Sequence, residues 1–516
     1  NTPICRERPC LDRRGTLQET TVTQSVSSGL AGRRDAPWDL EIRLSPETDL
    51  QLVVEESVAY QRWRPSVSAS GAAGTPLTLT ANLISKSGKP VTDAIKTITW
   101  ELVGTSQEPG LALNFPVGAK GVDDHFDLEL SSEGSDFQLQ NKNQLLIRNK
   151  TTPTRTDTIS IVPHDWGGWS EVQLSAVLES GIELKGRLRT TNEERIRLPK
   201  RQPNSKIADR WKELSGVSDE DASDAETAPE GDGHPGDGLT LYEEYRGFFE
   251  RGEHTEGSPV FKDLFVRNRA MFATLGGIAL FARETGVEVH YRLTDSEFPT
   301  NRVINSNFGA GPHSVDQHLV VMSVEKGLVK KAYASDFGPP KRVDHISIMS
   351  TWARYSSSVM ANVTAHELGH AVAVRHHGEG DPGDVVWSVS GGTLIETRAN
   401  GASMPIITFD GEFSDVTHYT ILMLNEADPT RPTREFYVGA RGGQHSGSTR
   451  CFMRYAAANK LIPEGVPNGR RYATEPQPVG FQLCDSRDGD GINPVEFGDG
   501  QAGCAHQLLV NDLYAP

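Results

Sequence analysis

Four residues with the chemistry of a hydrolytic metal site stand close together in the sequence: His366, Glu367, His370 and His376. On an α-helix, residues four apart share a face, so His366 and His370 can both direct a ring nitrogen at one ion. Glu367 is placed to reach a water molecule on that ion without being a ligand. Zinc held by three protein ligands lowers the pKa of such a water to about 7, and a neighbouring carboxylate can take its proton. The pattern predicts a zinc-dependent hydrolase with Glu367 as the general base.

The helix that must carry these residues is predicted from about residue 357 to residue 375. Apolar residues recur along it at spacings typical of a core-facing helix, namely Val359, Met360, Val363, Leu368 and Val372. The alternative is an exposed polar helix that happens to be rich in histidine. That alternative is less favoured, because burying an acid and two histidines without a role would cost free energy.

The segment resembles the metzincin clan of zinc endopeptidases, whose helix motif is His-Glu-x-x-His-x-x-Gly-x-x-His. Residues 366–376 match this motif in register, and the resemblance implies that the three histidines bind zinc. The departure is Ala373, where the clan has a glycine that lets the chain leave the helix with positive φ. Alanine can do so at a cost of about 1 kcal/mol. The alternative is a helix that continues to Gly378, with His377 as the third ligand.

A second part of the resemblance lies further along the chain, in residues 451–455. Metzincins have a turn beneath the metal that often reads small residue, any residue, Met, any residue, Tyr. The resemblance implies that Met453 packs under the zinc and that the Tyr455 hydroxyl reaches the metal or the developing oxyanion. The long separation from the helix implies an insertion over about residues 384–448. Met404 is the rival turn methionine, nearer in sequence but without a tyrosine two residues on, and Met453 can also be an ordinary core residue.

Two other hypotheses stay open. A gluzincin would take its third ligand from a downstream carboxylate, and Glu396 is the nearest candidate, although the usual spacing points to Val389 or Ser390. A calcium-dependent surface adhesin with a structural or decayed zinc site is the non-enzymatic alternative. The intact Glu367 argues against it, because a structural zinc site does not need a base.

An acidic segment precedes the predicted catalytic region and ends in the sequence GDGLTLYEEY. Oxygen ligands around a glycine turn, followed by glutamates at a helix start, suit a hard Ca²⁺ ion. The segment resembles the degenerate EF-hand-type loops of thrombospondin type 3 and dockerin-like linkers, which implies calcium bound by Asp237 and Glu244. A plain acidic linker is the alternative, because full loop spacing is absent. A second, shorter candidate contains Asp488 and Asp490.

Short runs of alternating apolar and polar residues, separated by turns, recur from Leu50 to Leu198 and predict an antiparallel sandwich. Part of this region, Gly74 to Leu113, resembles bacterial immunoglobulin-like modules. We therefore expect a multidomain protein in which an all-β module precedes an α+β zinc peptidase domain. The expected parts are an irregular lead-in over residues 1–45, an immunoglobulin-like β-sandwich over 46–198, the acidic linker over 199–246 and the peptidase domain over 247–516.

Within the predicted peptidase domain, local patterns indicate further elements. Helical periodicity covers Asp263 to Thr285, before the helix of the zinc motif. Strand-like runs follow at Val287 to Leu293, His318 to Val324 and His345 to Met349. The mixture predicts α+β structure.

Length, charge and cysteine content limit the class of protein. The 516 residues exceed what one core organises, and the net charge of −17 argues against a nucleic-acid partner. No run is apolar enough to span a bilayer. The five cysteines favour an oxidising compartment, with a Cys5–Cys10 disulfide and one pairing among Cys451, Cys484 and Cys504. We therefore expect a secreted or cell-surface protein whose partner is a protein or peptide substrate.

Overall fold

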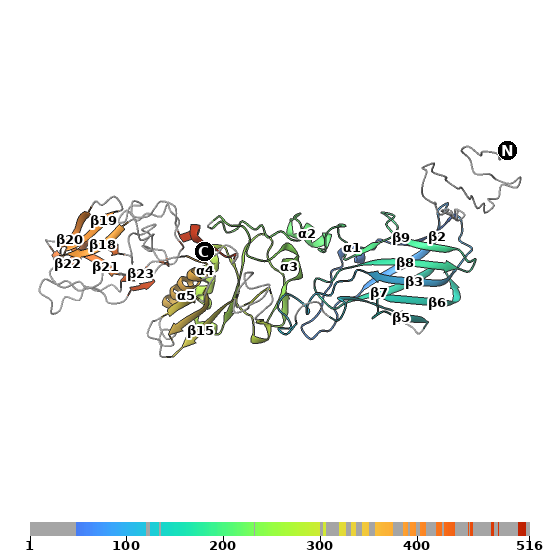
Figure 1. The fold of residues 1–516 in the computed structure, drawn as a ribbon, viewed down its shortest axis with the longest axis horizontal. Coiled ribbons are helices and arrows are strands. Elements are labelled where there is room, and N and C mark those ends of the chain that lie inside the picture. The colour runs from blue at the N-terminus through green and yellow to red at the C-terminus, as the bar shows by residue number, and fades with distance from the viewer. Residues whose placement is uncertain are drawn as a thin grey trace, which may run out of the picture.

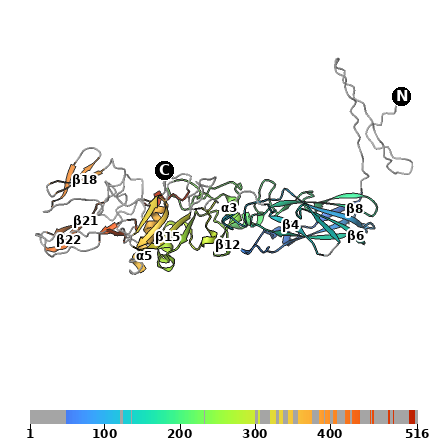
Figure 2. The same ribbon diagram turned by 60° about the horizontal axis from the view of Figure 1, so that its bottom comes forward.

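The structure is a computed structural model, and the parts of it that can be described follow one another in a row (Figures 1 and 2). The described residues are 48–119, 124–133, 136–231, 233–299, 303–305, 319–326, 332–336, 343–349, 357–374, 385–390, 393–398, 403–408, 419–425, 428–438, 452–453, 455–457, 476–478, 483 and 504–511. Over these residues the chain is mostly β-structure with few helices. No helix among them has the length and apolarity needed to cross a membrane.

The first part of the chain forms a ten-stranded, nearly closed sheet with the order β4-β7-β2-β1-β9-β8-β3-β6-β5, and β10 pairs with β8. The pairs are antiparallel except for β1 and β9, which run parallel. A short helix, α1 (Val58–Arg62), follows β1. The strands are β1 (Leu50–Val54), β2 (Leu77–Ser85), β3 (Ile95–Val103), β4 (Leu128–Ser131), β5 (Phe137–Gln140), β6 (Leu145–Thr154), β7 (Thr156–Pro163), β8 (Ser170–Leu178), β9 (Glu183–Leu188) and β10 (Ile196–Leu198).

The two ends of this sheet approach each other, because the Leu130 N–H donates to the Asn143 carbonyl oxygen at 2.8 Å. Alternate residues of β2, β7 and β8 are buried, as expected for strands with one face on a core. Trp100 lies in this core with no exposed surface. The expected all-β character of this part of the chain is therefore present. Its kinship with immunoglobulin-like modules stays a prediction.

Two short helices, α2 (Asp209–Ser215) and α3 (Leu241–Arg246), follow the sheet. The Thr240 side chain accepts from the Glu243 N–H, and the Glu243 carboxylate accepts from the Thr240 N–H, so α3 begins with a capping box. Trp211 of α2 and Tyr245 of α3 pack edge to face in a small core between the helices. Apolar packing therefore orders both helices even though the segment is acidic in composition.

A buried ion pair joins α3 to the first sheet. The Arg246 guanidinium donates to Asp165, in the loop between β7 and β8, through Nε to Oδ1 at 3.1 Å and Nη2 to Oδ2 at 2.6 Å. The Arg246 side chain is 4% exposed and that of Asp165 is fully buried. A two-point contact of this kind fixes the orientation as well as the distance of the two elements.

The next sheet contains five strands in the order β14-β13-β15-β17-β16. Its pairs are parallel except for β16 with β17, which is antiparallel. Two helices, α4 (Leu275–Thr285) and α5 (Ser357–Ala371), pack on each other, and α5 also contacts β16 and β17. The strands are β13 (Asp263–Asn268), β14 (Glu288–His290), β15 (Leu319–Glu325), β16 (Ala332–Asp336) and β17 (Val343–Met349).

The helix expected over Asp263–Thr285 is wrong in its first part, which is strand β13, while α4 begins only at Leu275. The first four residues of β13 are buried in succession because both faces are covered: Leu264 and Val266 pack in one core and Phe265 packs in another. A strand covered on both faces reads as a continuous apolar run, which periodicity cannot distinguish from a buried helix.

Several small elements complete the described chain. They include three 3-10 helices, η1 (Met271–Ala273), η2 (Asp295–Glu297) and η5 (Cys504–Gln507). The small sheets are formed by β11 (Phe248–Glu250) with β12 (Glu253–Thr255), β18 (Val385–Ser390) with β19 (Thr393–Arg398) and β20 (Ser403–Thr408), β21 (Tyr419–Asn425) with β22 (Asp428–Val438), and β23 (Tyr455–Ala457) with β24 (Pro476–Pro478). Cys504 is buried in the core around α4 and α5, and the other four cysteines lie outside the described residues, so the disulfides stay predictions.

The substitution Asp165→Ala tests the buried ion pair between α3 and the first sheet. It leaves the buried Arg246 without its carboxylate, so we expect the free energy of unfolding to fall by about 3–5 kcal/mol. Denaturant unfolding measures this loss. The control is Glu194→Ala, which removes an exposed partner of Arg187 and should change the free energy by less than about 1 kcal/mol. Equal effects of the two substitutions would contradict the assignment.

Candidate functional site

Helix α5 carries the chemistry-bearing residues, and its close packing on α4 fixes its position. A Cβ atom on Gly277 of α4 would lie 2.2 Å from the Thr364 Cβ and 2.6 Å from the Ala361 carbonyl oxygen. The two helices therefore approach to a distance that only glycine at position 277 allows. In Figure 1 the pair lies beside the sheet that contains β15.

His366 is buried, and its ring is oriented by a backbone carbonyl. Nδ1 lies 2.7 Å from the Phe452 carbonyl oxygen. A carbonyl oxygen only accepts, so Nδ1 must carry the proton, and Nε2 of the neutral ring then carries the lone pair. This is the arrangement that orients histidine ligands in metal sites.

His370 shows the same arrangement one helical turn later. Its Nδ1 lies 2.8 Å from the Val374 carbonyl oxygen, which assigns the proton to Nδ1 and the lone pair to Nε2. The rings of His366 and His370 have centroids 4.9 Å apart and are nearly perpendicular, at 87°. Two neighbouring imidazoles with the same tautomer form a donor set that zinc accepts readily.

Glu367 lies between these histidines in sequence and is only 5% exposed. The helix also buries the polar residues Asn362, Thr364 and His366, beside apolar residues that it contributes to the core. A buried carboxyl group next to a histidine is a candidate general base. The structure thus brings three of the four predicted site residues together on one helix.

At the end of α5, Ala373 adopts the left-handed conformation that the metzincin motif assigns to glycine. The helix ends at Ala371, and Ala373 has a φ of 65°. The Val374 N–H donates to the Gly369 carbonyl at 2.9 Å, and the Ala373 N–H donates to the His370 carbonyl at 3.1 Å. This is a Schellman motif with alanine in the left-handed position where glycine is usual.

Because the Schellman motif ends the helix, the alternative of a helix that continues to Gly378 is wrong. The chain leaves the helix at the position that the resemblance indicated, before it reaches His376. His376 and His377 both lie outside the described residues, so the choice between them as third ligand stays a prediction.

Met453 lies against α5 beside the two histidines. A Cβ atom on Gly369 would lie 2.4 Å from the Met453 Sδ, so glycine at this point of the helix makes room for the methionine. The preceding residue, Phe452, supplies the carbonyl that orients His366. One turn of chain therefore contacts both the ring of a candidate ligand and its helix. Sequence reasoning found the methionine but missed Gly369, although a glycine inside a buried helix is a signal of close packing.

The remaining sequence candidates fall at other places. Tyr455 begins β23, which pairs with β24, a strand in contact with α5. Met404 lies in strand β20, not in a turn, so it does not occupy the role of the rival turn methionine. Glu396 lies opposite Met404 in the neighbouring strand β19. Asp488 and Asp490 are outside the described residues.

The two acids proposed for calcium come together at a second place. Asp237 and Glu244 are fully buried, and both lie near Asp263, the first residue of β13. Asp224 and Glu226 form a further group with Asp237. Sequence reasoning missed Asp224 and Glu226, which lie in the same acidic segment, and Asp263, which lies beyond it. The one available signal was an aspartate at the head of an apolar run.

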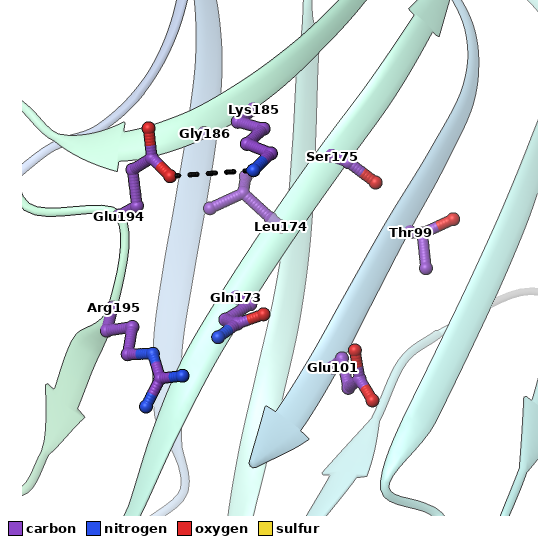
Figure 3. A pocket seen from close by; sticks show the side chains of 9 residues that line it. All are labelled: Thr99, Glu101, Gln173, Leu174, Ser175, Lys185, Gly186, Glu194 and Arg195. Atoms are coloured by element: carbon purple, nitrogen blue, oxygen red, sulfur yellow. Dashed lines mark ion pairs between the residues drawn. The ribbon is translucent and has the colours of Figure 1, made fainter. Parts of the chain in front are cut away.

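A shallow pocket on the first sheet has a different character (Figure 3). Three of its four charged lining residues are already paired, with Lys185 Nζ 3.9 Å from Glu194 and Arg195 3.2 Å from Glu171 outside the pocket. Figure 3 shows the Lys185–Glu194 pair across one side of the pocket. Charges that neutralise each other at an exposed surface give no converging set of groups for catalysis.

Comparison with known proteins leaves the function open. No family model matches the chain, and no curated protein matches it in sequence. The human F-spondin reeler domain has a TM-score of 0.18 and 10% sequence identity, covering 29% of this chain and 87% of that chain. The Reelin-N domain of F-spondin has a TM-score of 0.17 and 12% identity, covering 29% and 85%. Likeness at this level carries no argument about fold or function.

The substitution Gly369→Ala tests the contact between Met453 and α5. The added methyl group must displace the Met453 side chain, so we expect a loss of about 1–3 kcal/mol in the free energy of unfolding. The matched control is Gly276→Ala on α4, whose added Cβ would lie 3.6 Å from Ala361 Cβ in ordinary contact. That control should be neutral or should stabilise the helix by up to about 1 kcal/mol. Thermal unfolding of both variants decides the matter, and the same midpoint for the two would refute the contact.

Proposed function

We propose that this protein is a zinc-dependent endopeptidase of metzincin type, with zinc held by His366, His370 and His376. The observation that carries the proposal is the matched orientation of two histidines by backbone carbonyls on successive turns of a buried helix, with Glu367 between them. Hydrogen-bonded orientation of this kind raises the basicity of Nε2 and fixes its direction. A core helix without a metal has no comparable use for two oriented imidazoles and an acid.

Each residue of the proposed site has a separate role in peptide-bond hydrolysis. Zinc, when bound, would lower the pKa of a coordinated water and polarise the carbonyl of the peptide bond. The Glu367 carboxylate takes a proton from the attacking water and delivers it to the leaving amine. Tyr455 is proposed to donate its hydroxyl hydrogen to the oxygen on which negative charge develops. Met453 holds the helix from one side, which keeps the histidines in place.

The choice of metzincin over gluzincin rests on how the chain leaves α5. The left-handed conformation of Ala373 stands at the position of the glycine in the metzincin motif and turns the chain before His376. The contact of Met453 with Gly369 supports the same choice, because it puts the second motif of the resemblance beside the first. In the gluzincin alternative the third ligand would be Glu396 of β19.

The substitution Glu367→Gln tests the role of the general base. Glutamine keeps the size of the side chain but cannot take the proton, so we expect kcat/KM for peptide cleavage to fall by about 10²–10⁴-fold. Zinc content should stay at the parent level, because Glu367 is not a ligand. The matched control is Glu284→Gln on the neighbouring helix α4, which should cleave like the parent. Parent-level cleavage by Glu367→Gln would refute the mechanism.

Metal analysis of single variants tests the ligand set. His366→Ala and His370→Ala each remove a nitrogen ligand, so the purified proteins should contain less than about a tenth of the parent zinc. The control His345→Ala, on β17, removes a partner of Ser323 on β15 and should keep the parent zinc content. The third ligand is identified by comparing His376→Ala, His377→Ala and Glu396→Ala, of which only the true ligand should lose zinc. Retention of zinc by His366→Ala would exclude the proposed centre.

A further inference from the structure

The acidic cluster consists of five carboxyl groups: Asp237, Glu244, Asp263, Asp224 and Glu226. The first three come from the loop before α3, from α3 itself and from the start of β13. One oxygen of each of these three lies within 4.8 Å of the others, and all three side chains are fully buried. The other two form a second group of the same size with Asp237. Carboxylates therefore converge from three segments on one small volume.

Hydrogen bonds hold some members of the acidic cluster but leave Glu244 unsatisfied. Asp237 and Asp263 each accept backbone N–H groups, and Asp263 also lies 2.9 Å from Nε2 of His290. Within the described residues, no N–H group donates to either carboxylate oxygen of Glu244, and its side-chain contact is with another acid, the Glu226 carboxyl group. The same holds for Oε2 of Glu226 within that part of the chain. A fully buried carboxyl group with two unsatisfied oxygens, directed at other carboxylates, indicates a missing positive partner.

The electrostatics of the acidic cluster lead to the same conclusion. Desolvation, followed by the charges of Glu226, Asp237 and Asp263, raises the pKa of Glu244 to about 11. Desolvation and the charges of Asp263 and Glu226 also raise the pKa of Asp237 well above its usual value. His290 lies 2.9 Å from Asp263 and can supply a counter-charge there when it is protonated. A buried group of negative charges is costly unless a cation neutralises it.

We propose that the acidic cluster binds Ca²⁺, with Asp237, Glu244 and Asp263 as the innermost ligands. Ca²⁺ takes about 6–8 oxygen ligands at roughly 2.3–2.6 Å, so two oxygens on one ion lie at most about 5 Å apart. One oxygen of each of the three acids lies within 4.8 Å of the others, which this geometry permits. A set made of carboxylates suits a hard cation and disfavours zinc, which prefers nitrogen and sulfur. Mg²⁺ keeps several waters and seldom uses so many protein carboxylates.

The ion would join the acidic linker to the sheet that lies under α5. Asp237 and Glu244 belong to the linker, whereas Asp263 begins β13, an inner strand of that sheet between β14 and β15. Calcium binding would thus stabilise the junction rather than take part in chemistry, because binding to the folded state alone adds to its stability. This inference does not depend on the proposed peptidase function.

Calorimetric titration of the full chain with CaCl₂ tests the site directly. The protein is first stripped of divalent ions on a chelating resin and then kept in a fixed excess of zinc. We expect a single ion to bind with a Kd of about 10⁻⁷–10⁻⁵ M, and saturation to raise the thermal midpoint by about 5 °C or more. MgCl₂ is the comparison ion, and tighter binding of Mg²⁺ than of Ca²⁺ would overturn the choice of ion.

Glu244→Gln is the decisive variant, because it removes one charged ligand and keeps the shape. It should weaken calcium binding by about 100-fold. The matched control Glu213→Gln, on the exposed side of α2, should bind like the parent. His366→Ala, which lacks a candidate zinc ligand, should also bind calcium like the parent, so the two proposals fail separately. Parent-level binding by Glu244→Gln would overturn the assignment.

The pH dependence of the ion-free protein distinguishes a calcium site from a cluster of protonated acids. The raised folded-state pKa of Glu244 means that its protonation stabilises the fold below the usual value of 4.5, and that this contribution is lost progressively as the pH rises toward about 11. Without ions, Glu244→Gln should therefore be more stable than the parent at about pH 8 and similar to it at about pH 5. Calcium should reverse the order at about pH 8, because it stabilises the tighter-binding parent more than the variant. An unchanged parent midpoint in calcium would show that protons, not Ca²⁺, neutralise the cluster. The titratable groups near Glu244 are Asp224, Glu226, Asp237 and Asp263. Glu288 and His290 lie next to Asp263.

Discussion

The hydrogen bond between His366 Nδ1 and the Phe452 carbonyl oxygen, 2.7 Å long, is the contact on which the candidate zinc centre depends. It joins α5 to a turn 86 residues further along the chain and sets which nitrogen of the ring carries the proton. The same turn places Met453 against Gly369, so the position of the turn controls both ligand orientation and helix packing. If the turn moved away, His366 would lose its fixed tautomer and α5 would lose part of its core contact.

The C-terminal residues connect this helix to the acidic cluster. The Leu509 N–H donates to the Val372 carbonyl oxygen at 3.0 Å, just past the end of α5. Two residues later, Asn511 Nδ2 donates to Asp224 Oδ2 at 2.9 Å. Leu508 also lies so close to Gly231 that a Cβ there would be 1.9 Å from its carbonyl oxygen. A short stretch of chain is therefore held at one end by the candidate zinc helix and at the other by the acidic linker.

The parts of the site that the sequence predicted are those governed by local geometry. The spacing of His366, Glu367 and His370 requires only that a helix form, and α5 extends from Ser357 to Ala371, close to the predicted range. The left-handed conformation at Ala373 also follows from a local motif. The backbone carbonyls that orient the rings carry no sequence signal, because every residue has one.

Long-range contacts explain what sequence reasoning missed. Asp263 begins a strand whose next three residues are fully buried, and composition alone suggests an exposed acid at a strand end. Its part in the acidic cluster is visible only in the fold, where α3 brings Glu244 close to it. No periodic pattern in the sequence predicts that contact. Sequence reasoning also predicted a helix over Asp263–Asn268, because a strand buried on both faces has the same continuous apolar pattern as a buried helix.

Buried charge is the feature that both candidate sites share and that ordinary core formation disfavours. In α5 the acid is adjacent in sequence to an imidazole that can bind a cation, whereas in the acidic cluster carboxylates lie close to carboxylates. A core that only needed stability would replace such groups with apolar ones, since well-packed apolar residues are as stable or more so. Departures from core rules that are this concentrated mark places where something other than packing determines the residue. The two chemistries therefore call for different ions: one held by imidazole nitrogens, the other by carboxylate oxygens.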